Sequence, residues 1–208
     1  MDDIARERKL EADERAEQKK YSKLADSLTP LAKGMNSEYC NQNTYDALQI
    51  HGGSGFMMDY PIQRYYRDAR ITSIYEGTTQ LQVVAAIRYV TNGSYLAQMR
   101  EFEAAEVSEA MKPLQARAKV LADRFEEAVN RVKEAANAEY HDLCARHLVE
   151  MAADVIMLHL LLANATRSAE LFDKSARVYA RFVEAEVAKH HAFVMGLTLD
   201  DLADYRHA

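Results

Sequence analysis

Apolar side chains recur at every third or fourth position along most of this 208-residue chain, and no other feature restricts its fold as strongly. Such spacing places the apolar residues on one face of an α-helix. It is most regular beyond residue 93, in three segments at residues 99–132, 140–162 and 171–194. The sequence has no strand-like alternation of useful length and no fixed-period repeat. The pattern therefore predicts an all-α protein.

Prolines and polar residues predict where these helices meet. Pro113 should bend or divide the first segment, because proline disrupts a helix interior. The segments are joined near Asn137 and Thr166, and three long amphipathic helices with short joints favour an antiparallel bundle. Residues 94–208 are therefore expected to form an additional helical domain.

Composition and charge exclude several classes of protein. Seven glycines and three prolines are few for this length, which is typical of helices packed on helices. A net charge of -6 argues against broad electrostatic binding to nucleic acid. Cys40 and Cys144 form no CxxC unit and are expected to be buried. No apolar run approaches the ~20 residues that cross a bilayer, and the charged start is no signal peptide, so we expect a cytoplasmic protein.

The first half of the chain should be helical as well. Residues 1–20 are a charged lead-in, either a solvated helix or a frayed arm. An apolar stripe follows, and Pro30 within it predicts that a helix begins or kinks there and runs to about His51. Gly52 and Gly53 should end that helix.

Residues 49–82 hold four of the seven glycines and are the candidate site. Pro61 suits the first turn of a short helix that runs to Asp68. An irregular turn should follow, and Thr78 or Thr79 can then cap a helix that ends at the Asn-Gly pair at residues 92–93.

Glu76 lies in that irregular turn. A carboxylate can remove a weakly acidic proton if burial raises its pKa, and Ile74, Tyr75 and Gly77 predict a tight, poorly hydrated turn. Without further information, a Glu beside a helix start is more often a cap matched to the helix dipole than a catalytic base. Similar alternatives stay open for the neighbouring segments. Residues 78–80 suit an anionic partner or simple capping, and the GGSG segment follows a helix, so it is no dinucleotide fingerprint and fits a plain C-cap loop.

Several blocks in this region match a known family in order. They are residues 49–55, Tyr60-Pro61-Ile62, Arg67-Asp68-Ala69-Arg70 and residues 74–78 with Gln80 following. Residues 24–93 resemble the C-terminal domain of acyl-CoA dehydrogenases, the flavoenzymes that desaturate acyl-CoA thioesters. The fold implied is part of the family's helical bundle, followed by a second antiparallel bundle.

The resemblance assigns roles to individual residues. Glu76 would remove the substrate's α-proton while the β-hydrogen leaves as hydride to the flavin N5, and Gly77 would lie against the thioester. Contacts with the FAD of the same subunit are implied for Thr78, Thr79 and Gln80. Contacts with the FAD of a neighbouring subunit are implied for Gln49, Ile50, His51, Gly52 and Gly53. The resemblance also implies an acyl-CoA substrate, electron-transfer flavoprotein as electron acceptor, and a role in fatty acid β-oxidation.

The chain also departs from the family. A complete member has an N-terminal helical domain and a middle β-domain, so the chain resembles a C-terminal fragment. We expect three parts: the charged lead-in at residues 1–20, part of the family's helical bundle at residues 21–93, and the additional helical domain at residues 94–208. The fragment alone is expected to be inactive, and its uncovered apolar face should drive formation of a dimer or tetramer. The alternative is a non-catalytic helical oligomerisation module derived from this fold. We expect Arg67 and Asp68 to form a structural ion pair, and the seven histidines to form no metal site.

Overall fold

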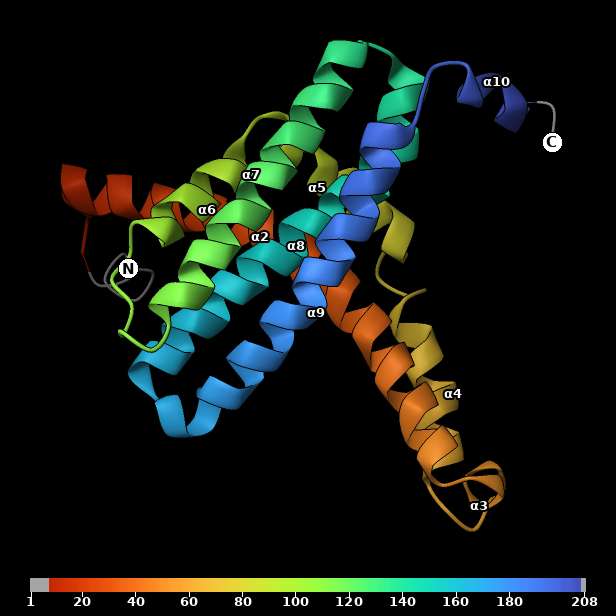
Figure 1. The fold of residues 1–208 in the computed structure, drawn as a ribbon. Helices are drawn as coiled ribbons and strands as arrows, with labels where there is room; N and C mark the ends of the chain where they lie inside the picture. The colour runs from red at the N-terminus through yellow and green to blue at the C-terminus, as the bar shows by residue number, and fades with distance from the viewer. Residues whose placement is uncertain (1–7, 207–208) are drawn as a thin grey trace.

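The computed structural model describes residues 8–206, with side chains described as far as residue 203. This part of the chain is α-helical and contains no strand, which confirms the all-α prediction (Figure 1). The helices are α2 (Ala12–Ile50), α3 (Gly53–Phe56), α4 (Ile62–Thr72), α5 (Thr79–Thr91), α6 (Ser94–Glu103), α7 (Lys112–Ala135), α8 (Ala138–Arg167), α9 (Ala169–Gly196) and α10 (Asp201–Arg206).

The three longest C-terminal helices, α7, α8 and α9, pack together as the predicted antiparallel bundle (Figure 1). Pro113 divides the first segment as expected, because α6 ends at Glu103 and α7 begins at Lys112 with the proline in its first turn. Asn137 caps α8, and its side-chain oxygen accepts a hydrogen bond from the Tyr140 backbone N–H. The sequence therefore predicted this bundle and its joints.

Helix α8 lies at the centre of the bundle. By length and composition it is the one helix among the described residues that could cross a membrane, a criterion that the buried core helix of a soluble protein also meets. Two thirds (67%) of its most apolar window is buried inside the fold, where α5, α7 and α9 contact it. Being apolar on most sides is what a helix surrounded by other helices requires.

Helix α2 continues through Pro30 instead of beginning there. Figure 1 shows that its first part and its last part run in different directions, which agrees with the kink that was the other prediction. One turn before the proline, the buried Tyr95 hydroxyl of α6 donates to the Ser27 carbonyl oxygen at 2.6 Å. Residues 12–20 of the charged lead-in form the start of this helix, and residues 1–7 lie outside the described residues. Lys20 pairs with Glu101 of α6 at 2.8 Å.

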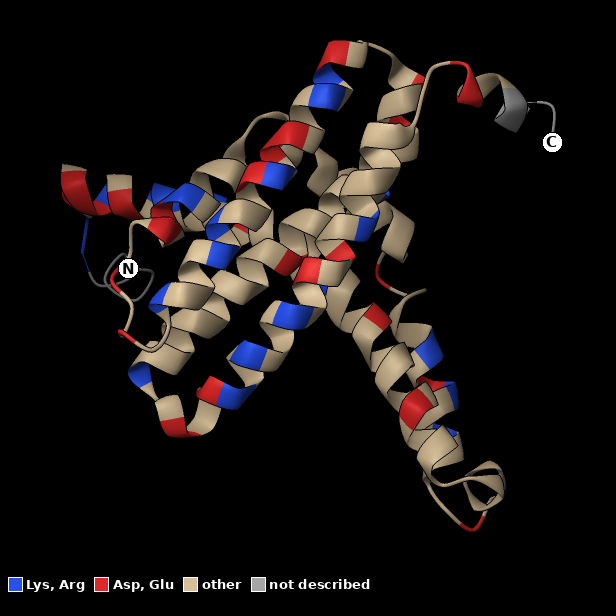
Figure 2. Cartoon of the chain, viewed as in Figure 1, with Lys and Arg blue, Asp and Glu red and all other residues tan. Residues whose placement is uncertain are grey.

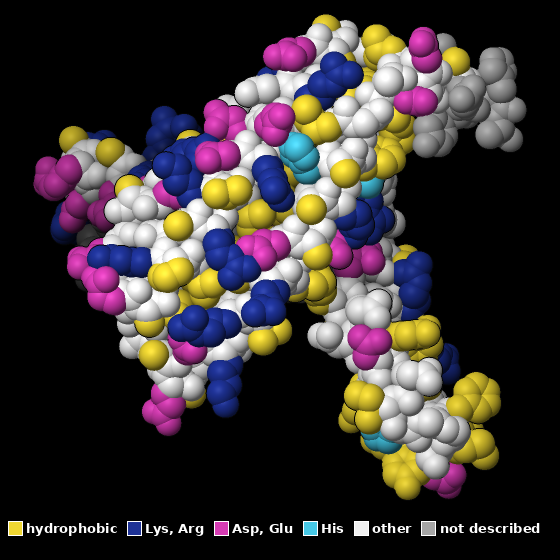
Figure 3. Space-filling view, viewed as in Figure 1, with side chains coloured by type: hydrophobic (Ala, Val, Ile, Leu, Met, Phe, Trp, Pro, Cys, Tyr) yellow, Lys and Arg dark blue, Asp and Glu magenta, His cyan; other side chains and the backbone are white. Residues whose placement is uncertain are grey.

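The second half of α2, α3 and α4 form an arm that projects from the bundle (Figure 1). The predicted glycine break ends α2, and Gly52 takes a positive φ of 59°. Helix α4 then runs back along α2. Acidic and basic side chains are interleaved over α7 to α9, but the tip of the arm around α3 carries few charges (Figure 2). Figure 3 shows hydrophobic side chains gathered at this tip.

Helices from both halves of the chain share one hydrophobic core. Leu31 of α2 and Val83, Ala86 and Val90 of α5 belong to the same buried cluster as the side chains of α6 to α9. Cys144 lies in this core as predicted, whereas Cys40 is exposed, because it lies on a side of α2 that no described helix covers.

Candidate functional site

The turn between α4 and α5 holds the predicted base in an unusual backbone conformation. Glu76 has φ 50° and Gly77 has φ 93°. A left-handed conformation costs a residue with a Cβ about 1–2 kcal/mol, so the surrounding contacts must hold it. Backbone strain of this kind is concentrated at functional sites, so it indicates that the Glu76 turn is a candidate active site.

Side chains from α2 and α5 hold this turn. The Lys33 ammonium donates to the carbonyl oxygens of Thr72 at 2.9 Å and Gly77 at 2.5 Å. The Ser37 hydroxyl also donates to the Thr72 carbonyl, at 2.9 Å, and the Gln82 side-chain amide donates to that of Gly77 at 3.3 Å. The sequence analysis missed these residues. The available signal was Gly34, a glycine inside a helix, which marks a close approach of two helices.

The backbone conformation at position 77 favours glycine. A Cβ built there would lie 2.7 Å from the Gln82 side-chain nitrogen, and φ 93° is strained for any other residue. Gly34 has a related role, because a Cβ there would lie 3.3 Å from the Gln82 Cβ. The two glycines let α2, α5 and the turn approach closely enough for Lys33 to reach both carbonyls.

The start of α5 lies beside this turn. Thr78 is the N-cap, as predicted, and its hydroxyl accepts a hydrogen bond from the Leu81 N–H at 3.3 Å. The Thr79 hydroxyl donates to Glu38 of α2 at 2.5 Å, and Gln80 is exposed. Thr79 therefore joins two helices in this chain, whereas Thr78 and Gln80 face the surface.

Glu76 is exposed, so the expectation of a poorly hydrated turn is wrong for this chain. Its neighbours Ile74 and Tyr75 are exposed too, as are Leu81 and Val84 on α5. These four apolar side chains are exposed close in sequence to the Glu76 carboxylate, which is exposed as well. The neighbouring sequence predicted the polarity of the surroundings correctly, but local sequence does not determine whether a surface is covered.

The second group of predicted residues lies at the tip of the arm. Gln49, Ile50 and His51 end α2, and all of them are exposed together with Gly52 and Gly53. The 11 residues of α4 separate this group from the Glu76 turn, which is roughly 16 Å at 1.5 Å per residue. Residues 49–53 and the Glu76 turn of one chain therefore cannot both contact the same small part of a ligand.

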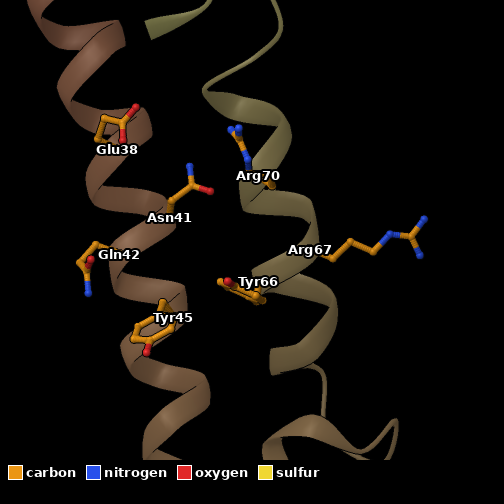
Figure 4. A pocket seen from close by; sticks show the side chains of 7 residues that line it. All are labelled: Glu38, Asn41, Gln42, Tyr45, Tyr66, Arg67 and Arg70. Atoms are coloured by element: carbon orange, nitrogen blue, oxygen red, sulfur yellow. The ribbon is translucent and has the colours of Figure 1, made fainter. Parts of the chain in front are cut away.

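A cleft of about 580 Å³ runs between α2 and α4 along the arm (Figure 4). Its polar side chains do not converge, because Arg67 points away from α2 and Arg70 donates to the Ser73 hydroxyl. The predicted ion pair between Arg67 and Asp68 is wrong, since no such pair occurs among the described residues. Adjacent residues on a helix point in different directions, which keeps these two charges apart.

Polar side chains also meet inside the C-terminal bundle. His147 and His190 lie with their Nδ1 atoms 2.8 Å apart, and His190 Nε2 lies 3.1 Å from Glu150. Burial lowers the pKa of both histidines. The part of the chain that the structure describes holds no group of three or more His, Cys, Asp or Glu side chains arranged for a metal ion.

Two models of one protein family match almost the whole chain. A family model described as "Acyl-CoA dehydrogenase, C-terminal domain" matches residues 5–89, and one described as "Acyl-CoA dehydrogenase C terminal" matches residues 91–202. The chain belongs to the acyl-CoA dehydrogenase family. The two matches meet near residue 90, one on the side of α2 to α5 and the other on the side of α6 to α9.

Individual members of the acyl-CoA dehydrogenase family are similar over shorter stretches. The broad-specificity linear acyl-CoA dehydrogenase FadE5 of Mycobacterium tuberculosis is 50% identical over 60 residues, which are 29% of this chain and 10% of that protein. Acryloyl-CoA reductase (NADH) of Anaerotignum propionicum is 61% identical over 75 residues, 32% of this chain and 18% of that protein. The chain thus spans under a fifth of the length of these relatives.

A solved structure is similar to the chain as well. The acyl-CoA dehydrogenase family protein from Porphyromonas gingivalis has a TM-score of 0.52 and 36% sequence identity, and the match covers 55% of this chain and 98% of that one.

FAD is the cofactor that the family implies, and the described residues fit it in two places. At the start of α5, the Thr78 hydroxyl accepts the cap hydrogen bond and keeps its own proton to donate, and Gln80 lies exposed beside it. At the tip, a Cβ on Gly52 or Gly53 would meet no atom within 4 Å, so the loop is open to a ligand from outside the chain. Both places suit an approaching partner, and neither forms an enclosed pocket within this chain.

Proposed function

We propose that this chain is the C-terminal part of an FAD-dependent acyl-CoA dehydrogenase that forms an α,β double bond in acyl-CoA thioesters. Glu76 serves as the base that removes the α-proton. Gly77 lies against the thioester, and Thr78, Thr79 and Gln80 contact the flavin of the same subunit. When bound, FAD supplies the acceptor for the β-hydride.

The observation that carries this proposal is the clamped, left-handed Glu76. An acidic residue that only interacts with solvent needs no strained backbone. It also needs no set of four hydrogen bonds from side chains of α2 and α5 to hold its turn. The apolar side chains around it provide the dry surroundings that a carboxylate base needs once a further protein surface covers them.

The arrangement at the tip of the arm supports a second part of the proposal. Residues 49–53 lie at the end of α4 opposite to Glu76, so they serve the FAD of a neighbouring subunit. The proposal therefore requires a homo-oligomer, and it predicts that the isolated chain is inactive. For the electron acceptor we propose electron-transfer flavoprotein. A relative from Acetobacterium woodii, 50% identical over 52 residues, is named as a subunit of a caffeyl-CoA reductase-Etf complex.

Substitution of Glu76 by Gln in the flavin-loaded enzyme that contains this chain tests the role of the base. The amide keeps the size of the side chain but cannot accept the proton, so turnover should fall by about 10²–10⁴-fold while the flavin stays bound. Absorbance of the bound flavin and its bleaching by acyl-CoA are the measurements. Loss of flavin with the substitution would show that Glu76 is structural.

The reverse direction is a second candidate function. Three of the similar proteins are named as reductases of acryloyl-CoA, arylacrylate and caffeyl-CoA, with identities of 50% to 61% over the aligned residues. The same carboxyl group, when protonated, can deliver its proton to the α-carbon, and reduced FAD, when bound, would supply the hydride that the β-carbon needs. Rates measured in both directions, with acyl-CoA and with the matching enoyl-CoA, decide between the two.

A further inference from the structure

The Glu76 turn has a support that the family comparison does not assign. Thr72 ends α4 and Gly77 follows Glu76, so their carbonyl oxygens lie on the two sides of the turn. The Lys33 ammonium donates to both, at 2.9 and 2.5 Å. It also lies 5.9 Å from the centroid of the Tyr75 ring. One side chain from α2 therefore contacts the residues before and after Glu76.

The chemistry of the ammonium suits this position. It has three donors and no acceptor, and two of the donors go to the carbonyls of the turn. Hydrogen bonds from a charged donor are shorter and stronger than neutral ones. Lys33 is partly buried, which limits competition from water.

The hydrogen bond from Lys33 to the Gly77 carbonyl restrains the backbone of Glu76. Relaxation of Glu76 from φ 50° to an ordinary conformation would turn the Gly77 peptide and move its carbonyl oxygen. The hydrogen bond from Lys33 to that oxygen opposes the movement. The direction in which the Glu76 carboxylate projects therefore depends on Lys33.

We propose that Lys33 is the positioning residue of the Glu76 turn and holds the carboxylate where proton removal requires it. Its importance for turnover rests on the proposed function, whereas its effect on the turn does not. Two measurements separate the two claims.

The first measurement uses this chain alone and follows hydrogen exchange at the Thr79 amide, which donates to the Ser73 carbonyl across the turn at 3.2 Å. Lys33→Met keeps most of the aliphatic stem and removes the donors, so exchange at this amide should become at least tenfold faster, with the amides of α8 unchanged. Lys23→Met, at an exposed position of the same helix, is the matched control. Lys33→Leu, which also lacks a donor, replaces Lys33→Met if that variant does not fold. Unchanged exchange at Thr79 in the folded variant would overturn the proposal.

The second measurement uses the flavin-loaded enzyme that contains this chain. Lys33→Met should lower kcat at least tenfold, leave KM and flavin content within about threefold of the unmodified enzyme, and be partly rescued by Lys33→Arg. A parallel loss of flavin and of substrate binding would contradict a positioning role. If exchange responds at Thr79 but Glu76→Gln keeps full turnover, the positioning stands and the proposed function fails.

Discussion

His159 shows how a single buried residue sets the response of this fold to acid. Its side chain is 4% exposed on α8, its Nε2 has no hydrogen-bond partner, and its ring lies near Phe102 with centroids 5.9 Å apart. Burial lowers its pKa from 6.5 to about 4. The folded protein therefore holds a neutral imidazole where the unfolded chain would take up a proton.

Substitution of His159 by Leu tests this effect. As pH falls from about 6.5 to about 4, His159 becomes protonated in the unfolded state but stays neutral in the folded state. The free energy of unfolding should therefore drop by up to about 3 kcal/mol. His159→Leu removes that loss, and it should be clearly more stable than the unmodified chain at pH 4.5 but similar at pH 7.5. Urea unfolding at both pH values measures it, with the more exposed His141→Leu as control. Equal acid sensitivity of both chains would contradict the account.

Asp154 acts at the scale of helices, because it joins three of them. Its side chain on α8 is 3% exposed, and its Oδ1 accepts hydrogen bonds from Tyr39 of α2 at 3.0 Å and from Tyr179 of α9 at 3.2 Å. Burial raises the pKa of this carboxyl group from 3.8 to about 6, although the two hydroxyl donors lower it. The contact therefore joins the arm to the bundle and carries a penalty when ionised.

Asp154 changes the free energy of unfolding with pH in the opposite direction to His159. Between about pH 4 and 6 the folded state holds a proton that the unfolded state releases, so Asp154 lowers stability as pH rises through this window. Asp154→Asn keeps an acceptor oxygen and removes the titration. Its stability relative to the unmodified chain should therefore rise by roughly 2–3 kcal/mol from pH 4 to pH 7.5. Calorimetry at the two pH values measures this difference, and Asp142→Asn at an exposed site is the control. A difference that does not change with pH would refute it.

The described part of the molecule exposes large apolar side chains at the tip of the arm and near Glu76. At the tip of the arm, where hydrophobic side chains gather (Figure 3), Ile50, Phe56 and Met58 are 85%, 79% and 88% exposed. The apolar residues next to Glu76 in the sequence are exposed as well. Patches of this kind mark protein contacts. The chain should therefore self-associate through the arm.

Light scattering tests this association. The chain should be a dimer or tetramer at micromolar concentration, and the double substitution Ile50→Asp and Met58→Asp should shift it to the monomer without loss of helical signal, because charges at a contact are costly to desolvate. Leu171→Asp, at a 70% exposed position on α9, should leave the association unchanged. A stable monomer of the unmodified chain would contradict the role of the arm.

Sequence reasoning predicted the helices and their ends well, because apolar spacing and caps are local signals. The break at Gly52, the cap at Thr78 and the division at Pro113 all follow from single residues. The continuation of α2 through Pro30 was harder to predict, because packing of Leu31 into the shared core and the contact from Tyr95 support the helix there.

The candidate site was predictable only in part. The turn around Glu76 and Gly77 was located correctly from its glycine and its family motif. Its exposure and its clamp were not, because Lys33 is 44 residues from Gly77 in the sequence and is brought to the turn by the packing of α2 on α4 and α5. Long-range contacts of this kind leave no local pattern. The expected pair of Arg67 and Asp68 failed for a local reason, because adjacent residues on a helix point in different directions.

The most direct test of the central claim follows the α-hydrogen of the substrate. The flavin-loaded enzyme that contains this chain, mixed with an acyl-CoA in deuterated water, should exchange the hydrogen next to the thioester carbonyl for deuterium, as mass spectrometry of the recovered thioester would show. Glu76→Gln should slow this exchange at least 100-fold with the flavin still bound. Exchange at the unmodified rate in Glu76→Gln would show that another group removes the proton.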